Sequence, residues 1–367
     1  KVSAAGPLAL NSVSHPNDGR IRGRAGCAER AETETVLMDI PRRPLGKTGL
    51  QVSVLAVGGH HIGDPKDYEQ AEAIVAHAVD AGINFFDCCW EYHNGKSEEW
   101  LGRALVGKRQ RVHVMTKVCT HGRDGTLGLA MLEQSLRRLN TDYVDVWQIH
   151  AISYDNDPAL AYARGGIVEA LDKAKRQGKA RFVGFTGHKN PDFHFEMLKR
   201  GFPFDTVQMP LNAMDWHFHS FTHKVLPEAV KRGMGVLGMK PMGGTATVVK
   251  AKVLTGEECL RYAMSLRGVA TTICGMESVT VLDDNVRVAR GFQPLDEAAM
   301  QAIRNKVAPF AGDGRFEVYK LSLKFDNPET RRPHGFPVDE QEKEIQDELS
   351  ERLGLPGVDS MRPTERP

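Results

Sequence analysis

The sequence predicts an α/β protein, a (β/α)8 TIM barrel with a disordered N-terminal extension and a C-terminal extension. The first supporting observation is an alternation: between residues 52 and 290, a short apolar run is repeatedly followed by an amphipathic stretch. The second is the count of eight runs and eight stretches in about 240 residues, which suits this barrel. The third concerns the rival fold, a doubly wound open sheet, which usually has a GxGxxG turn after its first strand. Here the first run is followed by Gly-Gly-His-His-Ile-Gly, which lacks that spacing.

The apolar runs are predicted strands, because they are rich in Val, Ile, Phe and Leu with little polar alternation, as in strands covered on both faces. In chain order they occupy residues 52–57, 84–88, 112–118, 143–149, 180–185, 206–209, 235–239 and 270–274. The amphipathic stretches are predicted helices, and several are followed by glycine, which often ends a helix. They occupy residues 67–81, 97–106, 126–139, 167–177, 191–199, 221–231, 256–265 and 280–289.

Three parts are expected along the chain: a flexible N-terminal extension over residues 1–41, the barrel over 42–310, and a partly disordered C-terminal extension over 311–367. The N-terminal part is rich in Ala, Gly, Arg and Glu and has no apolar period. We expect Met38 to be the natural start, with a transit peptide as the competing interpretation. The C-terminal part is polar and rich in proline.

Composition excludes several classes of protein. Lys and Arg number 48 against 47 Asp and Glu, a net charge of +1, so bulk charge favours neither nucleic acid nor a membrane surface as a partner. No window of about 20 apolar residues is present, so no membrane span is expected. The six cysteines contain no CxxC pair and two are adjacent, which indicates a reducing compartment and a cytoplasmic protein.

Four ionisable residues follow three consecutive predicted strands. Asp87 and Tyr92 come after the second, Lys117 ends the third and His150 ends the fourth. A charged lysine or a histidine that closes an apolar run is costly to bury unless it is paired. Because the chemistry of such barrels takes place at the carboxyl ends of the strands, these four residues are the predicted catalytic group.

This constellation resembles the aldo-keto reductase superfamily, whose tetrad is Asp, Tyr, Lys and His at these strand ends. Asp87 and Tyr92 are five residues apart, and residues 94–98 follow them as the NGxSE segment. Lys117 and His150 are 33 residues apart, also in the family's register. The resemblance implies an NAD(P)H-dependent oxidoreductase that reduces a small-molecule aldehyde or ketone to an alcohol by hydride transfer.

The residue chemistry agrees with that implication. A phenol ordinarily loses its proton near pH 10, and the Lys117 ammonium is expected to lower the pKa of Tyr92. Asp87 can hold the lysine by a charge-assisted hydrogen bond, and His150 can orient the carbonyl. Tyr92 then acts as the proton donor, while the hydride must come from a cofactor, because no side chain supplies one.

The resemblance also assigns cofactor-binding positions on the later strands and loops. Thr186 keeps the hydroxyl of the family's Ser-Asn pair, Met239 replaces an aromatic residue, and Lys240 replaces a serine and either pairs with pyrophosphate or lies on the rim. The predicted cofactor-binding residues are Thr186, Gln208, Met239, Lys240, Gly243, Gly275, Glu277, Ser278, Asp284 and Asn285. NADP(H) is the family default. NAD(H) is possible because Glu277 occupies the position where members that prefer NADP carry a basic residue.

The predicted substrate pocket contains Trp90, His60 and Trp216. No metal site is expected, because His60 and His61 are adjacent and no carboxylate or cysteine joins them at metal-binding spacing. Two other functions compete with a reductase: a cofactor-binding regulatory member with little turnover, and a Schiff-base lyase that uses Lys117 or Lys240 as the amine. The tetrad in register favours the reductase, and the oligomeric state is left open.

Overall fold

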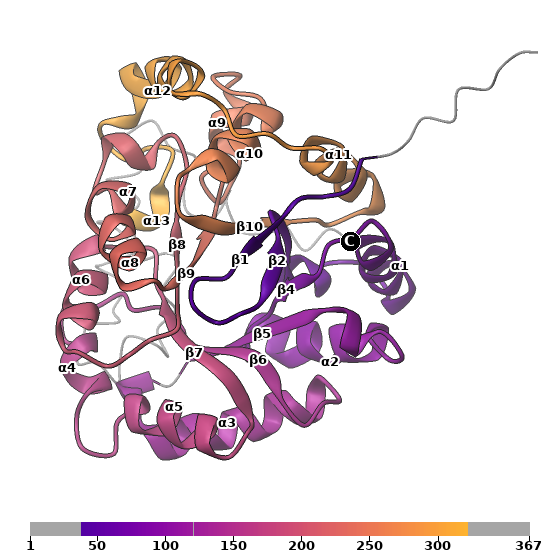
Figure 1. The fold of residues 1–367 in the computed structure, drawn as a ribbon, viewed down its shortest axis with the longest axis vertical. Coiled ribbons are helices and arrows are strands. Elements are labelled where there is room, and N and C mark those ends of the chain that lie inside the picture. The colour runs from indigo at the N-terminus through magenta and orange to yellow at the C-terminus, as the bar shows by residue number, and fades with distance from the viewer. Residues whose placement is uncertain (1–37, 120, 322–367) are drawn as a thin grey trace, which may run out of the picture. The chain divides into compact units, whose positions relative to one another are not determined.

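The computed structural model describes residues 38–119 and 121–321. Residues 1–37 of the predicted N-terminal extension (1–41) and residues 322–367 of the predicted C-terminal extension (311–367) lie outside the described residues. Within the described part, eight parallel strands close into a barrel, with β10 (Val269–Gly275) paired to β3 (Leu55–Gly58) to complete the ring. Helices lie outside the ring of strands (Figure 1). The predicted (β/α)8 barrel is therefore confirmed.

The strand and helix bounds agree closely with the predicted ranges. The other barrel strands are β4 Phe85–Asp87, β5 His113–Val118, β6 Val144–Ile149, β7 Ala180–Thr186, β8 Thr206–Pro210 and β9 Gly235–Met239. The described helices are α1 Tyr68–Asp80, α2 Lys96–Ala104, α3 Gly125–Arg138, α4 Asp157–Ala161, α5 Ile167–Arg176, α6 Pro191–Lys199, α7 Phe221–Lys224, α8 Leu226–Arg232, α9 Thr247–Lys250, α10 Gly256–Ser265, α11 Val279–Ala289, α12 Glu297–Ala311 and α13 Val318–Leu321.

The first predicted strand, residues 52–57, is two strands in the structure. Its first part belongs to β2 (Gln51–Ser53), which pairs antiparallel with β1 (Arg42–Pro44), and only its second part enters the barrel as β3. The hairpin closes one end of the barrel, because Leu45, Leu50 and Val52 join the interior cluster of apolar side chains. Both halves of the run are buried, so its apolar character does not reveal the break between them.

Two helical segments differ from the expectation. The predicted helix 221–231 is divided into α7 and α8, because Pro227 lies in the first turn of α8 and has no N–H to continue the preceding helix. Helix α12 was not expected at all. It starts at Asp296, whose side chain accepts from the Ala299 N–H, and it buries Met300 and Val307.

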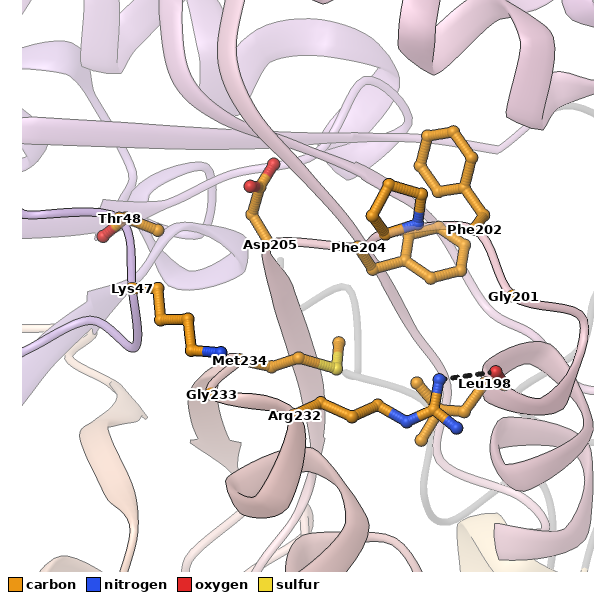
Figure 2. A pocket seen from close by; sticks show the side chains of 11 residues that line it. Lys47, Thr48, Leu198, Gly201, Phe202, Phe204, Asp205, Arg232, Gly233 and Met234 are labelled. Atoms are coloured by element: carbon orange, nitrogen blue, oxygen red, sulfur yellow. Dashed lines mark hydrogen bonds between the residues drawn. The ribbon is translucent and has the colours of Figure 1, made fainter.

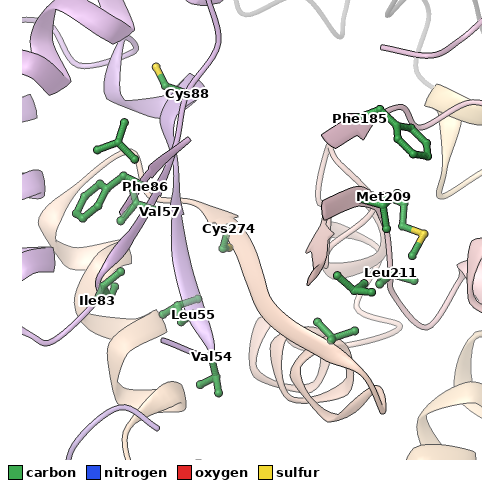
Figure 3. Packing of buried hydrophobic residues seen from close by; sticks show 14 of the residues in the cluster. Val54, Leu55, Val57, Ile83, Phe86, Cys88, Phe185, Met209, Leu211 and Cys274 are labelled. Carbon is green, nitrogen blue, oxygen red and sulfur yellow. The ribbon is translucent and has the colours of Figure 1, made fainter. Parts of the chain in front are cut away.

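The core has two layers. One fills the barrel, and the larger one lies between the strands and the helices (Figure 3), where Val57 and Phe86 pack on one side of the ring and Phe185 and Met209 on the other. Just before the hairpin, Ile40 is also buried in this larger layer. None of the described helices is long and apolar enough to cross a membrane.

Candidate active site

The barrel brings Asp87 and Lys117 together at the carboxyl ends of β4 and β5. The Lys117 ammonium donates to Asp87 Oδ1 and, at 2.6 Å, to the Cys88 carbonyl oxygen. Asp87 also accepts from Gln208 Nε2 at 3.2 Å. The Lys117 side chain is 1% exposed and that of Asp87 is 4% exposed. Burial alone would lower the pKa of Lys117, but the Asp87 carboxylate raises it above its ordinary value, so the lysine keeps its proton.

Tyr92 lies in a 3-10 turn (Tyr92–Gly95) directly over this pair. The Lys117 Nζ atom is 4.8 Å from the centroid of the Tyr92 ring, and the His150 ring lies 5.9 Å away at an interplanar angle of 84°. All four tetrad residues are therefore neighbours. Burial raises the pKa of the Tyr92 phenol, and Lys117 acts in the opposite direction. The Lys117 ammonium was expected to lower the pKa of Tyr92, but the effect of burial is larger and the pKa is raised.

Glu91 and Arg123 support His150, and the sequence analysis did not single out either. The His150 Nδ1 atom lies 2.7 Å from Glu91 Oε1 and 3.3 Å from Cys89 Sγ. Arg123 donates to the His150 carbonyl oxygen at 2.7 Å and is itself held by Asp157 Oδ1 at 2.6 Å. These contacts fix both the ring and the backbone of His150. No spacing rule reveals them, because they depend on where the loop side chains point.

The three predicted substrate-pocket residues fall in different places. The His60 ring lies 5.2 Å from the Tyr92 ring. Trp90 donates through Nε1 to Gln134 Oε1 at 2.8 Å, on the α3 side of the site. Trp216 lies under Arg304 of α12, whose guanidinium is 4.2 Å from its ring. The structure thus places His60 beside the tetrad, while Trp216 packs against α12.

The predicted cofactor residues on β7 and β8 lie next to the tetrad. Thr186 and Gln208 are buried, and their strands pair in register at these two residues. The Gln208 amide nitrogen is bound to Asp87, whereas its buried Oε1 atom has no hydrogen-bond partner among the described residues. An amide acceptor of this kind suits the carboxamide of a nicotinamide ring.

Lys240 follows Met239, the last residue of β9, and has a left-handed backbone with φ of 54°. Its ammonium lies 5.1 Å from the ring of Tyr319, a residue of α13 that also lies 5.6 Å from the His188 ring. Burial and the Lys117 ammonium lower the pKa of Lys240 to about 8. A cation in this position suits a pyrophosphate group.

The segment around α13 covers the loops that follow β8 and β9. Asn212 donates to the Lys240 carbonyl oxygen at 3.1 Å and to Glu317 Oε1 at 3.2 Å. Lys320 donates to Asp215 Oδ1 at 2.7 Å and to Glu317 Oε2 at 2.9 Å. The backbone of Gly243 lies close to the Phe316 carbonyl oxygen, since a Cβ at position 243 would stand 2.3 Å from it. This segment was expected to belong to a C-terminal extension, and it packs on the loops at the carboxyl ends of β8 and β9.

The remaining cofactor positions lie at the end of β10 and the start of α11. Ser278 caps α11, accepting from the Val281 N–H at 3.2 Å, and Gly275 ends β10. Asn285 is buried and Asp284 is exposed, pairing with Arg287 at 3.6 Å. Glu277 is exposed just before the cap.

A separate cavity of about 430 Å³ lies at the opposite end of the strands (Figure 2). It is lined by Phe204 and Asp205, which precede β8, and by Met234, which precedes β9. Arg232 reaches across it to the Leu198 carbonyl oxygen at 2.8 Å. In barrels of this kind, the amino ends of the strands serve stability and not chemistry, so we do not place the active site here.

The barrel fold and the group of Asp87, Tyr92, Lys117 and His150 at its strand ends point to one class of protein, the barrel oxidoreductases. Comparison with known proteins agrees: the model of the Aldo/keto reductase family matches residues 54–254, more than half of the chain. The chain therefore belongs to the aldo/keto reductase family and is an oxidoreductase.

Several relatives are similar to the chain over most of their length. L-galactose dehydrogenase of Arabidopsis thaliana is 28% identical, covering 74% of this chain and 97% of the relative. Methylglyoxal reductase YeaE of Escherichia coli is 32% identical, over 52% of this chain and 65% of the relative. A solved putative aldo-keto reductase from Pseudomonas aeruginosa shares 27% identity with a TM-score of 0.56, covering 68% of this chain and 94% of that one. The holo form of an aldo-keto reductase from Bacillus halodurans shares the fold, at 24% identity and a TM-score of 0.62, covering 73% of this chain and 96% of that one.

Proposed function

We propose that the protein reduces a small-molecule aldehyde or ketone to an alcohol with NAD(P)H, and that Tyr92 donates the proton. The observation that carries the proposal is the buried Asp87–Lys117 pair, with its ammonium 4.8 Å from the Tyr92 ring centroid and with the His150 ring 5.9 Å from the same ring. A lysine with a purely structural role needs only the carboxylate that pairs with it. Lys117 also faces the Tyr92 phenol at the carboxyl ends of the strands.

The site residues fit a nicotinamide dinucleotide. Gln208 Oε1 is a buried acceptor without a partner among the described residues, and the Lys240 ammonium lies among the loops that follow the strands. Gln208 and Thr186 would hold the nicotinamide end, Lys240 the pyrophosphate, and the start of α11 the adenosine end. When bound, this group supplies the hydride.

The chain's own residues move and hold the proton. Tyr92 gives its phenolic proton to the carbonyl oxygen of the substrate as that oxygen gains charge. Lys117 stabilises the phenolate left behind, and Asp87 holds Lys117 in place. His150, oriented through Nδ1 by Glu91, presents its other ring nitrogen to the substrate oxygen. Burial keeps Tyr92 protonated before the reaction, as a donor must be.

NADP(H) is the cofactor that the family implies. NAD(H) is the alternative, because Glu277 is exposed beside the N-cap of α11. A cytoplasmic location is also proposed, because none of the five described cysteines forms a disulfide, as is usual in a reducing compartment. The names of the relatives suggest sugars and small ketoaldehydes as the first substrates to test.

A Schiff-base lyase is the second candidate, and one observation favours it: the pKa of Lys240 is lowered to about 8, which increases the fraction of free amine. Lys117 is less suited, because its pKa is raised beside Asp87. The two functions differ in their need for a cofactor, which only the reductase consumes.

The test has two stages. NADPH and NADH are titrated by protein fluorescence, and consumption of the tighter cofactor is followed with a panel that includes L-galactose and methylglyoxal. Tyr92→Phe should then bind the cofactor within about twofold of the wild type and lose at least about a hundredfold in rate, because only the proton donor is removed. Near-native turnover by Tyr92→Phe would refute the proposal.

A further inference from the structure

A cluster of three histidines around one carboxylate lies beside Tyr92, and the proposed reaction does not use it as a unit. His60 and His61 lie in the 3-10 turn after β3 (Gly59–Ile62), and Asp64 follows that turn. His93 comes from the turn that carries Tyr92. Two loops that belong to consecutive β/α units therefore meet at one aspartate.

The separations between the donor atoms match those of a metal site. His93 Nε2 lies 3.0 Å from Asp64 Oδ1, and His60 Nδ1 lies 3.7 Å from Asp64 Oδ2. The ligand atoms of His60, Asp64 and His93 all lie within 4.8 Å of one another. Zinc binds nitrogen and oxygen ligands tetrahedrally at about 2.0–2.2 Å, so neighbouring ligand atoms are about 3.4 Å apart. His61 Nε2 lies 3.9 Å from Asp64 Oδ2 but is not part of this group of three mutually close ligand atoms.

The position of His93 is fixed by the backbone and by close packing. Its φ of 52° is unusual for a residue other than glycine, which indicates that the surroundings hold it there. Gly63 lies against it: a Cβ at Gly63 would stand 2.4 Å from His93 Cδ2. The buried His93 Nε2 atom approaches Asp64 but has no hydrogen bond among the described residues. A metal ion between the two groups would be bound by both this nitrogen and the Asp64 carboxylate.

We propose that His60, Asp64 and His93 bind one divalent transition-metal ion of the zinc class at the mouth of the barrel. Two imidazoles and one carboxylate favour this class over magnesium or calcium, which prefer oxygen ligands. The ion joins the turn after β3 to the turn that carries Tyr92.

Binding is tested directly, without an activity readout. The full chain, free of any affinity tag and treated with chelator, is dialysed against Zn²⁺ and the bound metal is counted. One Zn²⁺ per chain is expected, and Asp64→Asn, a nearly isosteric change at a partly exposed residue, should weaken it at least about tenfold. The matched control is Asp283→Asn, which removes a carboxylate 2.6 Å from His77 on the outer helices and should bind as the wild type does.

Two further variants keep the test decisive. His93→Gln should weaken binding as Asp64→Asn does, and thermal unfolding in chelator shows that each variant is folded. Cys89, Glu91 and His150 are a second group with ligand atoms within 4.8 Å of one another. The proposal is overturned if Asp64→Asn and His93→Gln both keep wild-type affinity, or if only Glu91→Gln loses the ion.

Discussion

Replacing Lys117 by methionine measures how much the buried Asp87–Lys117 pair contributes to the stability of the protein. Methionine has a similar length and no charge, so the change removes the ammonium with little loss of packing. It also removes two hydrogen-bond donors, one to Asp87 and one to the Cys88 carbonyl oxygen. Asp87 keeps the Gln208 amide at 3.2 Å, but its charge is left buried without a cation.

The expected loss of stability comes from the Asp87 carboxylate, which stays buried without a cation beside it. Removing one partner of a buried ion pair lowers the free energy of unfolding by about 3–5 kcal/mol. The carboxyl group can instead take up a proton, which costs an aspartate about 1.4 kcal/mol per pH unit above its ordinary value of about 3.9. Proton uptake therefore limits the loss to about 4 kcal/mol at pH 7 and about 1.5 kcal/mol at pH 5. Lys117→Met should thus be less destabilising at the lower pH.

Urea unfolding at pH 7 and pH 5 measures both numbers. The matched control is Lys306→Met, which breaks an exposed pair with Glu258 and should lower the free energy of unfolding by less than about 1 kcal/mol. The double variant Asp87→Asn with Lys117→Met should recover at least about half of the lost stability, because no charge is stranded, yet remain inactive. The reasoning is refuted if Lys117→Met loses less than about 1 kcal/mol at pH 7, or if the loss is the same at both pH values.

Three other experiments, two substitutions and one chemical trapping, test the rest of the site. Glu277→Lys should raise NADPH affinity relative to NADH by about tenfold, because a carboxylate expected beside the 2′-phosphate of NADPH is replaced by a cation. If the ratio of the two dissociation constants at low salt is unchanged, Glu277 does not face the ribose. Glu91→Gln should lower kcat at least about tenfold while the melting temperature and the cofactor Kd change little, because the Glu91 carboxylate orients the His150 ring and the amide has the same size. Borohydride with substrate should trap no covalent adduct, and a mass increase located on Lys117 or Lys240 would favour the lyase instead.

The barrel could be predicted from the sequence because each of its strands is a short, strongly apolar run bounded by helix-forming stretches. The antiparallel hairpin of β1 and β2 could not be predicted in this way. Val52 of β2 and Leu55 of β3 are both fully buried, so the change from pairing in the hairpin to pairing in the barrel leaves no mark in the composition of the run. Helix α12 had a detectable capping residue, Asp296, but it lies beyond the regular alternation and contains Pro309 near its end.

The tetrad was predictable because its residues stand at fixed places relative to the strand ends. Glu91 is adjacent to Tyr92 in sequence, but only the folded loop shows that its carboxylate meets His150. The same is true of Asp64 and His93, which are 29 positions apart and come together only through two loop conformations. A metal site was not expected, because no carboxylate or cysteine joins His60 and His61 at metal-binding spacing in the sequence, and spacing does not indicate which side chains of separate loops come together.

The covering of the β8 and β9 loops by α13 has a consequence for the order in which the protein is made. Lys320 and Asp215 are 105 residues apart, as are Glu317 and Asn212. The last barrel strand is complete at Gly275, so the ribosome adds the residues that cover these loops only after every strand has been synthesised. A nascent chain that has reached residue 311 would carry all eight strands, while Asp215 still lacked the ammonium of Lys320. The contacts that cover the loops after β8 and β9 can therefore form only after every strand of the barrel has been synthesised.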